Sequence, residues 1–86
     1  MSYTVVIKRQ AQKKLQSLTR PDRYRIAEKI ELLGDDPDSP ELDVKKLEGA
    51  PYWRMRVGNW RVIFDRQDEV RIIAIEKIGA RGDVYK

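Results

Sequence analysis

The segment PYWRMRVGNWRVIF, residues 51–64, restricts the fold of this chain more than any other part of the sequence. Two runs of alternating side chains flank Gly58-Asn59, a dipeptide that suits the two-residue type I′ or II′ turn of a β-hairpin. Such a turn fixes which residues of the two strands lie opposite each other. The predicted pairs are Val57 with Trp60, Arg56 with Arg61, Met55 with Val62, Arg54 with Ile63, and Trp53 with Phe64.

This register gives the hairpin one apolar face and one basic face, because side chains alternate along a strand. The apolar face suits a core and carries Trp53, Met55, Val57, Trp60, Val62 and Phe64. The opposite face carries Arg54, Arg56, Arg61 and Ile63. The apolar set is complete only in this register, and a slip of one residue would mix the two sets.

Arg56 and Arg61 form a like-charge pair across the predicted hairpin, an arrangement that costs on the order of 0.2–1 kcal/mol. Folding alone would not select this pair, whereas an anion bound between two guanidinium groups would make it favourable. Phosphate is the best candidate, because a guanidinium binds two of its oxygens as a fork. The alternative is that these arginines extend into water or pair with acids such as Asp65 or Glu76.

Two helices are predicted before the hairpin. The first covers residues 9–18, where Ala11, Leu15 and Leu18 recur at helical spacing. The second follows Thr19 as a capping residue, with Pro21 and Asp22 in its first turn. Its apolar stripe consists of Ile26, Ile30 and Leu33, and Gly34 is expected to end it.

Strands are predicted on both sides of these helices. The β-branched run YTVVIK, residues 3–8, reads as the first strand, and three more cover about 52–57, 60–65 and 70–77. The segment between Gly34 and Pro51 is expected to be a loop and a transition without a strand. The order β-α-α-β-β-β predicts a single α+β domain over residues 1–86, with a two-helix hairpin on one face of a mainly antiparallel four-stranded sheet. The first strand must pair with a later one, and the last strand is the best candidate.

Composition narrows the possible chemistry. The 86 residues contain no cysteine and no histidine, so catalysis would have to use Arg, Lys, Tyr or carboxylates, and we expect no metal or other cofactor. Net charge is +4, and residues 52–86 hold eight Lys/Arg against five Asp/Glu. This bias favours an anionic partner such as nucleic acid, although a basic surface without a partner is an alternative. With no apolar run of about 18 residues and no signal-peptide pattern, the predicted location is the cytoplasm.

The tail IEKIGARGDVYK brings two more candidates. Arg81 lies between Gly79 and Gly82, and Tyr85 is the penultimate residue. If the last strand lies beside the 60–65 strand, Arg81 reaches the same basic face. Tyr85 either packs on the edge of the domain or stacks on a base, as aromatic rings do in single-stranded nucleic-acid complexes.

The segments KKLEG, WRMRVGNWRVIF and IGARGDVY, together with the helical hairpin after the first strand, resemble the RelE/ParE superfamily of bacterial toxin–antitoxin toxins. The resemblance covers nearly all of the chain and looks like the RelE branch. It implies a ribosome-dependent endoribonuclease that cleaves messenger RNA in the ribosomal A site once its antitoxin is released. The ParE branch, which inhibits DNA gyrase and cuts nothing, is the alternative.

The resemblance also assigns residues. Basic positions on the second strand of RelE toxins match Arg54 and Arg56, the arginine after the turn matches Arg61, and the tail residues match Arg81 and Tyr85. It implies attack of a ribose 2′-hydroxyl on the adjacent phosphate, without a metal. Many relatives have histidine where Ala80 stands, so the groups that move protons stay open.

The resemblance implies partners as well. A toxin of this kind pairs with a RelB-like antitoxin, expected to be an acidic helical segment that covers the basic face. The other expected partners are the ribosome and messenger RNA. Lys45 and Lys46 are either contacts to ribosomal RNA or part of a solvated edge.

Overall fold

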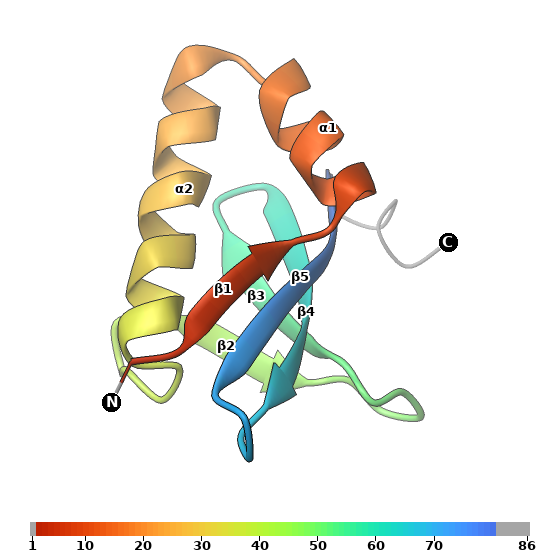
Figure 1. Ribbon diagram of the computed structural model, residues 1–86. Helices are drawn as coiled ribbons and strands as arrows, with labels where there is room; N and C mark the ends of the chain where they lie inside the picture. Colours follow the sequence, from red (N-terminus) through yellow and green to blue (C-terminus); the bar gives the residue numbers. More distant parts are fainter. Residues whose placement is uncertain (1, 81–86) are drawn as a thin grey trace.

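The computed structural model describes residues 2–80, which form one mixed sheet with both helices on the same face (Figure 1). The elements are β1 Thr4–Ile7, α1 Arg9–Ser17, α2 Arg20–Asp35, β2 Asp43–Lys46, β3 Trp53–Val57, β4 Trp60–Gln67 and β5 Ile72–Ala80. The strand order is β1-β5-β4-β3-β2, with β1 parallel to β5 and the other neighbours antiparallel. The predicted α+β class and the pairing of the first strand with the last are confirmed.

The sheet has five strands rather than the predicted four. The additional strand, β2, lies within the segment expected to be a transition and pairs antiparallel with β3 at one edge of the sheet. Its sequence is DVKK, so Val44 is the one apolar side chain and it packs against the core. A short, charged edge strand resists pairing with other chains, but it shows no apolar alternation from which it could be recognised.

The buried faces of both helices follow the predicted pattern. Ala11 and Leu15 of α1 are buried, and so are the residues of the predicted stripe on α2. Thr19 occupies the N-cap position of α2, but its side chain makes no capping hydrogen bond, so the predicted cap is wrong in that respect. No helix within residues 2–80 is long and apolar enough to cross a membrane.

Gly34 lies inside the last turn of α2, which continues to Asp35, so it does not end the helix as predicted. Its role is a close approach between α2 and β1. A Cβ atom at this position would lie 2.7 Å from Cγ2 of Val5, closer than real side chains come. The carbonyl oxygen of Gly34 also accepts a hydrogen bond of 2.6 Å from the backbone N–H of Tyr3. Glycine therefore lets the helix lie directly against the first strand.

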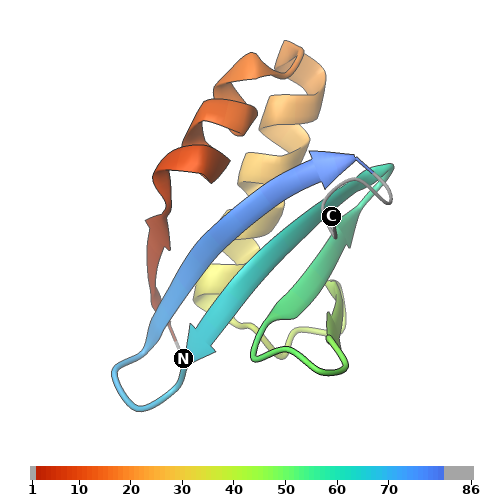
Figure 2. The same cartoon turned by 90° about the vertical axis from the view of Figure 1, so that its right-hand side faces the viewer.

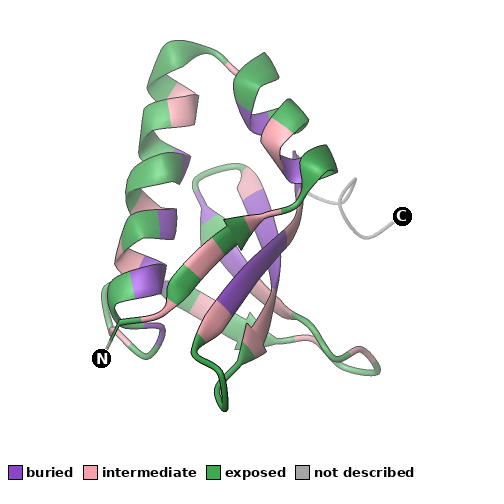
Figure 3. Cartoon of the chain, in the orientation of Figure 1, coloured by how far each residue is buried: buried purple, intermediate pink, exposed green. Residues whose placement is uncertain are grey.

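The β3–β4 hairpin has the predicted register, including Arg56 opposite Arg61. Gly58 has a φ of 59°, while Asn59 is not among the described residues with positive φ, so the turn fits type II′ rather than type I′. The apolar face of the hairpin, the inner faces of both helices and β5 form the core (Figure 3). Phe64, Met55 and Ile26 are fully buried at its centre. The hairpin is thus held by a core on one side, which leaves its basic side for other interactions.

Candidate nucleic-acid interface

The core residues of the hairpin pack with the helices, so the basic side chains lie on the opposite face of the sheet. Figure 2 shows the strands that form this face. We call the residues Asp43, Lys45, Arg54, Arg56 and Arg61 the arginine face. The strand register places them together: Asp43 of β2 lies beside Arg56 of β3, and Lys45 lies beside Arg54. Arg56 in turn lies opposite Arg61 of β4. The three predicted arginines therefore occupy one continuous surface formed by neighbouring strands.

Arg61 is buried, with 6% of its surface exposed. This differs from the expectation of an exposed arginine. Across the sheet, Arg61 pairs with Gly79 of β5, which has no side chain. Its guanidinium turns back along the strand, and Nη1 donates hydrogen bonds to the carbonyl oxygens of Trp60 at 3.0 Å and Gly58 at 3.3 Å. The turn carbonyls thus anchor one nitrogen of the cation.

The acceptors of Arg61 are neutral. Within residues 2–80, no carboxylate forms an ion pair with its guanidinium. A buried cation without a negative partner has lost water without recovering an equivalent interaction. A bound anion would supply that interaction, and Arg56 on the neighbouring strand would strengthen it. Arg61 is therefore the strongest candidate in the described structure for binding phosphate.

Arg54 and Arg56 share one carboxylate, that of Asp43. Nη1 of Arg54 donates a hydrogen bond of 3.2 Å to Oδ1, and Nε of Arg56 lies 3.8 Å from Oδ2. The predicted alternative of pairing with acids is thus partly realised, but with Asp43 rather than Asp65 or Glu76. Arg54 is largely enclosed, with 11% of its side chain exposed, whereas 51% of the Arg56 side chain is exposed. Arg56 is the accessible member of the group.

The two lysines predicted for RNA or ribosome binding are separated by the strand alternation. Lys45 belongs to the arginine face, beside Arg54. Lys46 projects to the other side, where its Nζ lies 5.7 Å from the ring centroid of Trp53 and donates a hydrogen bond of 3.2 Å to the carbonyl oxygen of Ala50. Only Lys45 therefore extends the basic surface around Arg54 and Arg56.

Two predicted catalytic residues, Arg81 and Tyr85, lie outside the described residues. The last described residue is Ala80 of β5, which pairs with Trp60. Its neighbour Gly79 pairs with Arg61. The described part of β5 therefore ends beside the buried arginine, at the same end of the sheet.

An arginine that was not among the predicted site residues lies at the opposite end of the sheet. Arg66 of β4 forms a two-point ion pair with Asp38, with N–O distances of 2.8 and 3.1 Å, and its Nε donates a 2.7 Å hydrogen bond to Asp68. Its guanidinium also lies over the rings of Tyr3 and Trp53, at 5.7 and 5.8 Å from their centroids. This one side chain connects the start of β1, the loop after α2 and the turn after β4.

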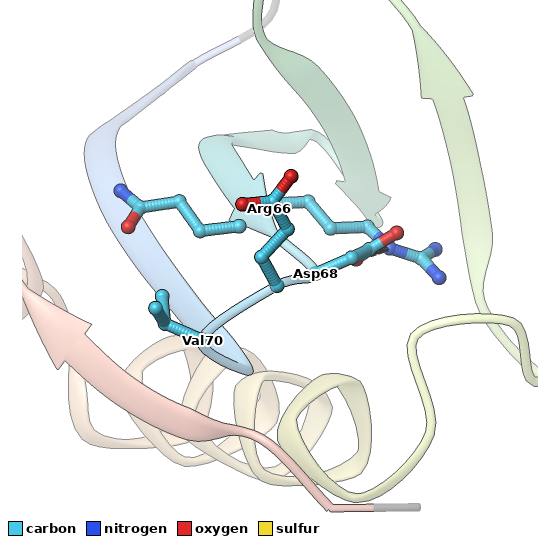
Figure 4. A pocket seen from close by; sticks show the side chains of 5 residues that line it. Arg66, Asp68 and Val70 are labelled. Carbon is cyan, nitrogen blue, oxygen red and sulfur yellow. Dashed lines mark hydrogen bonds and ion pairs between the residues drawn. The ribbon is translucent and has the colours of Figure 1, made fainter.

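Hydrogen bonding from Arg66 holds the pKa of Asp38 and Asp68 below the usual range, and the Tyr3 hydroxyl lowers that of Asp68 further. The same carboxylates raise the pKa of Arg66. A shallow pocket beside this cluster is lined by residues 66–70 (Figure 4). Because two carboxylates already bind the Arg66 cation, we interpret this cluster as structural. Sequence spacing could not reveal it, because Asp38 is 28 residues from Arg66.

The family model and the most similar curated proteins point to the same protein family. A model of the ParE toxin family of type II toxin–antitoxin systems matches residues 5–85. A putative toxin RelE1 of Methanocaldococcus jannaschii is 34% identical over 88 residues, covering 100% of this chain and 98% of that protein. A putative RelE-like toxin protein of Escherichia coli is 28% identical and covers 99% of this chain and 92% of its own length.

Solved structures agree with this result. The toxin in the archaeal RelE–RelB complex of Pyrococcus horikoshii OT3 superposes with a TM-score of 0.83 and 35% identity, covering 98% of this chain and 100% of that one. The RelB–RelE antitoxin–toxin complex of Methanococcus jannaschii gives a TM-score of 0.75 and 25% identity, over 94% and 95% of the two chains. The chain therefore belongs to the RelE/ParE superfamily, as a RelE-like toxin of a toxin–antitoxin pair.

Proposed function

We propose that this toxin is a ribosome-dependent endoribonuclease that cleaves messenger RNA in the A site and thereby inhibits translation. The observation that carries the proposal is the buried Arg61 cation, which has no carboxylate partner among the described residues and lies opposite the exposed Arg56. Two arginines at facing positions of a hairpin are suited to a phosphodiester, because each guanidinium presents paired N–H donors in a plane.

The proposed reaction is attack of a ribose 2′-hydroxyl on the adjacent phosphorus atom. The P–O bond to the 5′-oxygen of the next nucleotide breaks, which leaves a 2′,3′-cyclic phosphate and a free 5′-hydroxyl. This chemistry requires alignment of the attacking oxygen, transfer of one proton at each end, and stabilisation of negative charge on the phosphate. It needs neither a protein nucleophile nor a metal.

We assign the roles as follows. Arg61 and Arg81 bind the scissile phosphate and stabilise the charge that develops on it. Arg54 and Arg56 bind the flanking phosphates, and Tyr85 stacks on or orients a base, or acts in proton transfer. An ordinary arginine is a poor base, because its pKa exceeds about 12. The protein therefore mainly aligns the RNA, and the ribosome contributes the remaining groups, which requires that free RNA is cleaved poorly.

The proposed antitoxin is a RelB-like acidic helical segment that covers the arginine face. Two of the structural relatives are complexes of RelE with RelB. An acidic segment would compete with RNA phosphate for Arg56 and Arg61, so one surface would serve both substrate binding and inhibition.

A second candidate is inhibition of DNA gyrase, as in the ParE branch, because the matching family model carries the ParE description. Brief induction of the toxin alone separates the two. An endoribonuclease stops protein synthesis first, and primer extension on translated messages detects new ends within codons. A gyrase inhibitor raises the DNA-damage response first and leaves messages intact, and that result would overturn the proposal.

A further inference from the structure

A second group of basic residues surrounds the tip of the β3–β4 hairpin on the side of the helices. Lys14 of α1 places its Nζ 5.7 Å from the centroid of the Trp60 ring. Arg25 of α2 reaches the turn itself, since its Nη1 lies 3.5 Å from the position that a Cβ on Gly58 would occupy. We call Lys14, Arg25 and Trp60 the turn patch. Both helices contribute a cation to it, and the hairpin contributes an aromatic ring.

The turn patch is continuous with the arginine face. The guanidinium of Arg61 donates hydrogen bonds to the carbonyl oxygens of Gly58 and Trp60, which belong to the same turn that Lys14 and Arg25 approach from the other side. Positive charge therefore continues from one side of the sheet, around the end of the hairpin, to the other.

The chain around the turn patch is strongly basic. Residues 8–25 contain one acid, Asp22, and seven bases: Lys8, Arg9, Lys13, Lys14, Arg20, Arg23 and Arg25. Lys14 and Arg25 are both exposed, and Trp60 is half-buried. Within residues 2–80, neither Lys14 nor Arg25 forms an ion pair with a carboxylate. The core does not require these cations, and their charge is available to a ligand.

We propose that the turn patch binds the single-stranded RNA next to the segment held on the arginine face, with Lys14 and Arg25 on two phosphates and Trp60 against a base. This inference rests on the proposed function. Single-stranded nucleic acid is bound by basic grooves that follow the backbone and by aromatic rings on which bases stack. An acidic peptide would use the cations equally well, but it would not account for the aromatic ring beside Lys14.

The test uses Trp60 as the reporter. The chain has two tryptophans, so Trp53→Phe leaves Trp60 as the sole indole. The purified Trp53→Phe protein is titrated with a 2′-O-methyl RNA octamer, which cannot undergo 2′-hydroxyl attack, and both fluorescence and its salt dependence are measured. We expect saturable quenching of Trp60. In a Lys14→Ala/Arg25→Ala variant, the slope of log affinity against log salt should be less steep by about 1.4, about 0.7 for each lost phosphate contact.

The matched control is Lys13→Ala/Arg20→Ala, which removes the same two residue types, one from α1 and one from α2, at exposed positions. Its salt slope should equal that of the parent protein. The inference would be overturned if RNA does not quench Trp60, or if the salt slopes of the parent protein and both double variants are equal. Either result would count even if the induced toxin cleaves messages. Quenching without cleavage in cells would instead overturn the proposed function. Normal RNA binding by Lys14→Ala/Arg25→Ala, with weaker binding of an acidic RelB peptide, would assign the turn patch to the antitoxin and refute an RNA role.

Discussion

Replacing Arg61 by methionine should abolish toxicity and, at the same time, stabilise the fold. The wild-type side chain is a cation with 6% exposure, lies opposite Arg56, and has neutral acceptors in the described structure. Methionine is similar in length and carries no charge, so it can occupy the same space. Burial of such a cation is favourable when an anion is bound and unfavourable when the site is empty.

The magnitude follows from three contributions. Removing the like-charge pair with Arg56 contributes about 0.2–1 kcal/mol to stability. Removing a largely desolvated cation contributes several kcal/mol before compensation. Against these, two hydrogen bonds from the cation to Gly58 and Trp60 are lost, at roughly 1.5 to 3 kcal/mol each, and the loss is smaller at Gly58 because its exposed carbonyl can return to water. The expected net change is an increase of about 1 kcal/mol in the free energy of unfolding, or roughly 4–8 °C in Tm for a domain of this size.

The assay is thermal and urea unfolding of the purified proteins, with Arg56→Met as the control. Half of the Arg56 side chain is exposed, so its replacement recovers little desolvation. Relief of the repulsion with Arg61 is offset by loss of the contact with Asp43, so stability should change by less than about 0.5 kcal/mol. Added inorganic phosphate should raise the Tm of the wild type more than that of Arg61→Met. The reasoning is refuted if Arg61→Met lowers Tm by several degrees, because Arg61 would then be a structural residue.

Three further changes test other parts of the structure. Asp43→Asn removes the carboxylate that Arg54 and Arg56 share, so the protein should bind an RNA oligonucleotide more tightly, as measured by fluorescence anisotropy. The free energy of unfolding should change by less than about 1 kcal/mol. Weaker RNA binding would mean that Asp43 positions the arginines. Arg66→Gln should reduce the loss of stability on acidification, because it removes the cation that lowers the pKa of Asp38 and Asp68. In the wild type these lowered pKa values stabilise the fold above about pH 4. That contribution disappears as the pH falls through the pKa values of the folded state. Equal acid-unfolding curves for Arg66→Gln and wild type would contradict that account. Gly34→Ala should lower the free energy of unfolding by about 1–3 kcal/mol. The loss should be smaller in a Val5→Ala background, because the clashing Cγ2 is then absent. If urea unfolding shows that the effects of the two substitutions are additive, the close contact is not supported.

Local pattern was enough to predict the hairpin. The Gly58-Asn59 turn and the alternation around it determine the register, so Arg56 opposite Arg61 could be predicted from sequence and is confirmed. The same holds for the helices, whose apolar spacing identifies their buried faces. Each of these features depends on residues that are close in the chain.

The features that were missed depend on residues far apart in the chain. The ion pair between Arg54 and Asp43 requires that β2 joins the sheet, and nothing in DVKK indicates a strand. Gly34 resembles a helix stop until Val5 is seen against it. The burial of Arg61 and its hydrogen bonds to the turn carbonyls are not revealed by a strand pattern. Sequence thus predicts which residues share a face, but not how deeply each is buried or which acid it meets.

The most direct test of the central proposal uses purified ribosomes stalled with a defined codon in the A site. Wild-type toxin and Arg61→Met are added, and the message is analysed for cleavage and for the chemical nature of the new ends. We predict cleavage within the A-site codon by the wild type, with a 2′,3′-cyclic phosphate on the upstream fragment, and no cleavage by folded Arg61→Met. An intact message with wild-type toxin, or equal cleavage by the two proteins, would contradict the account.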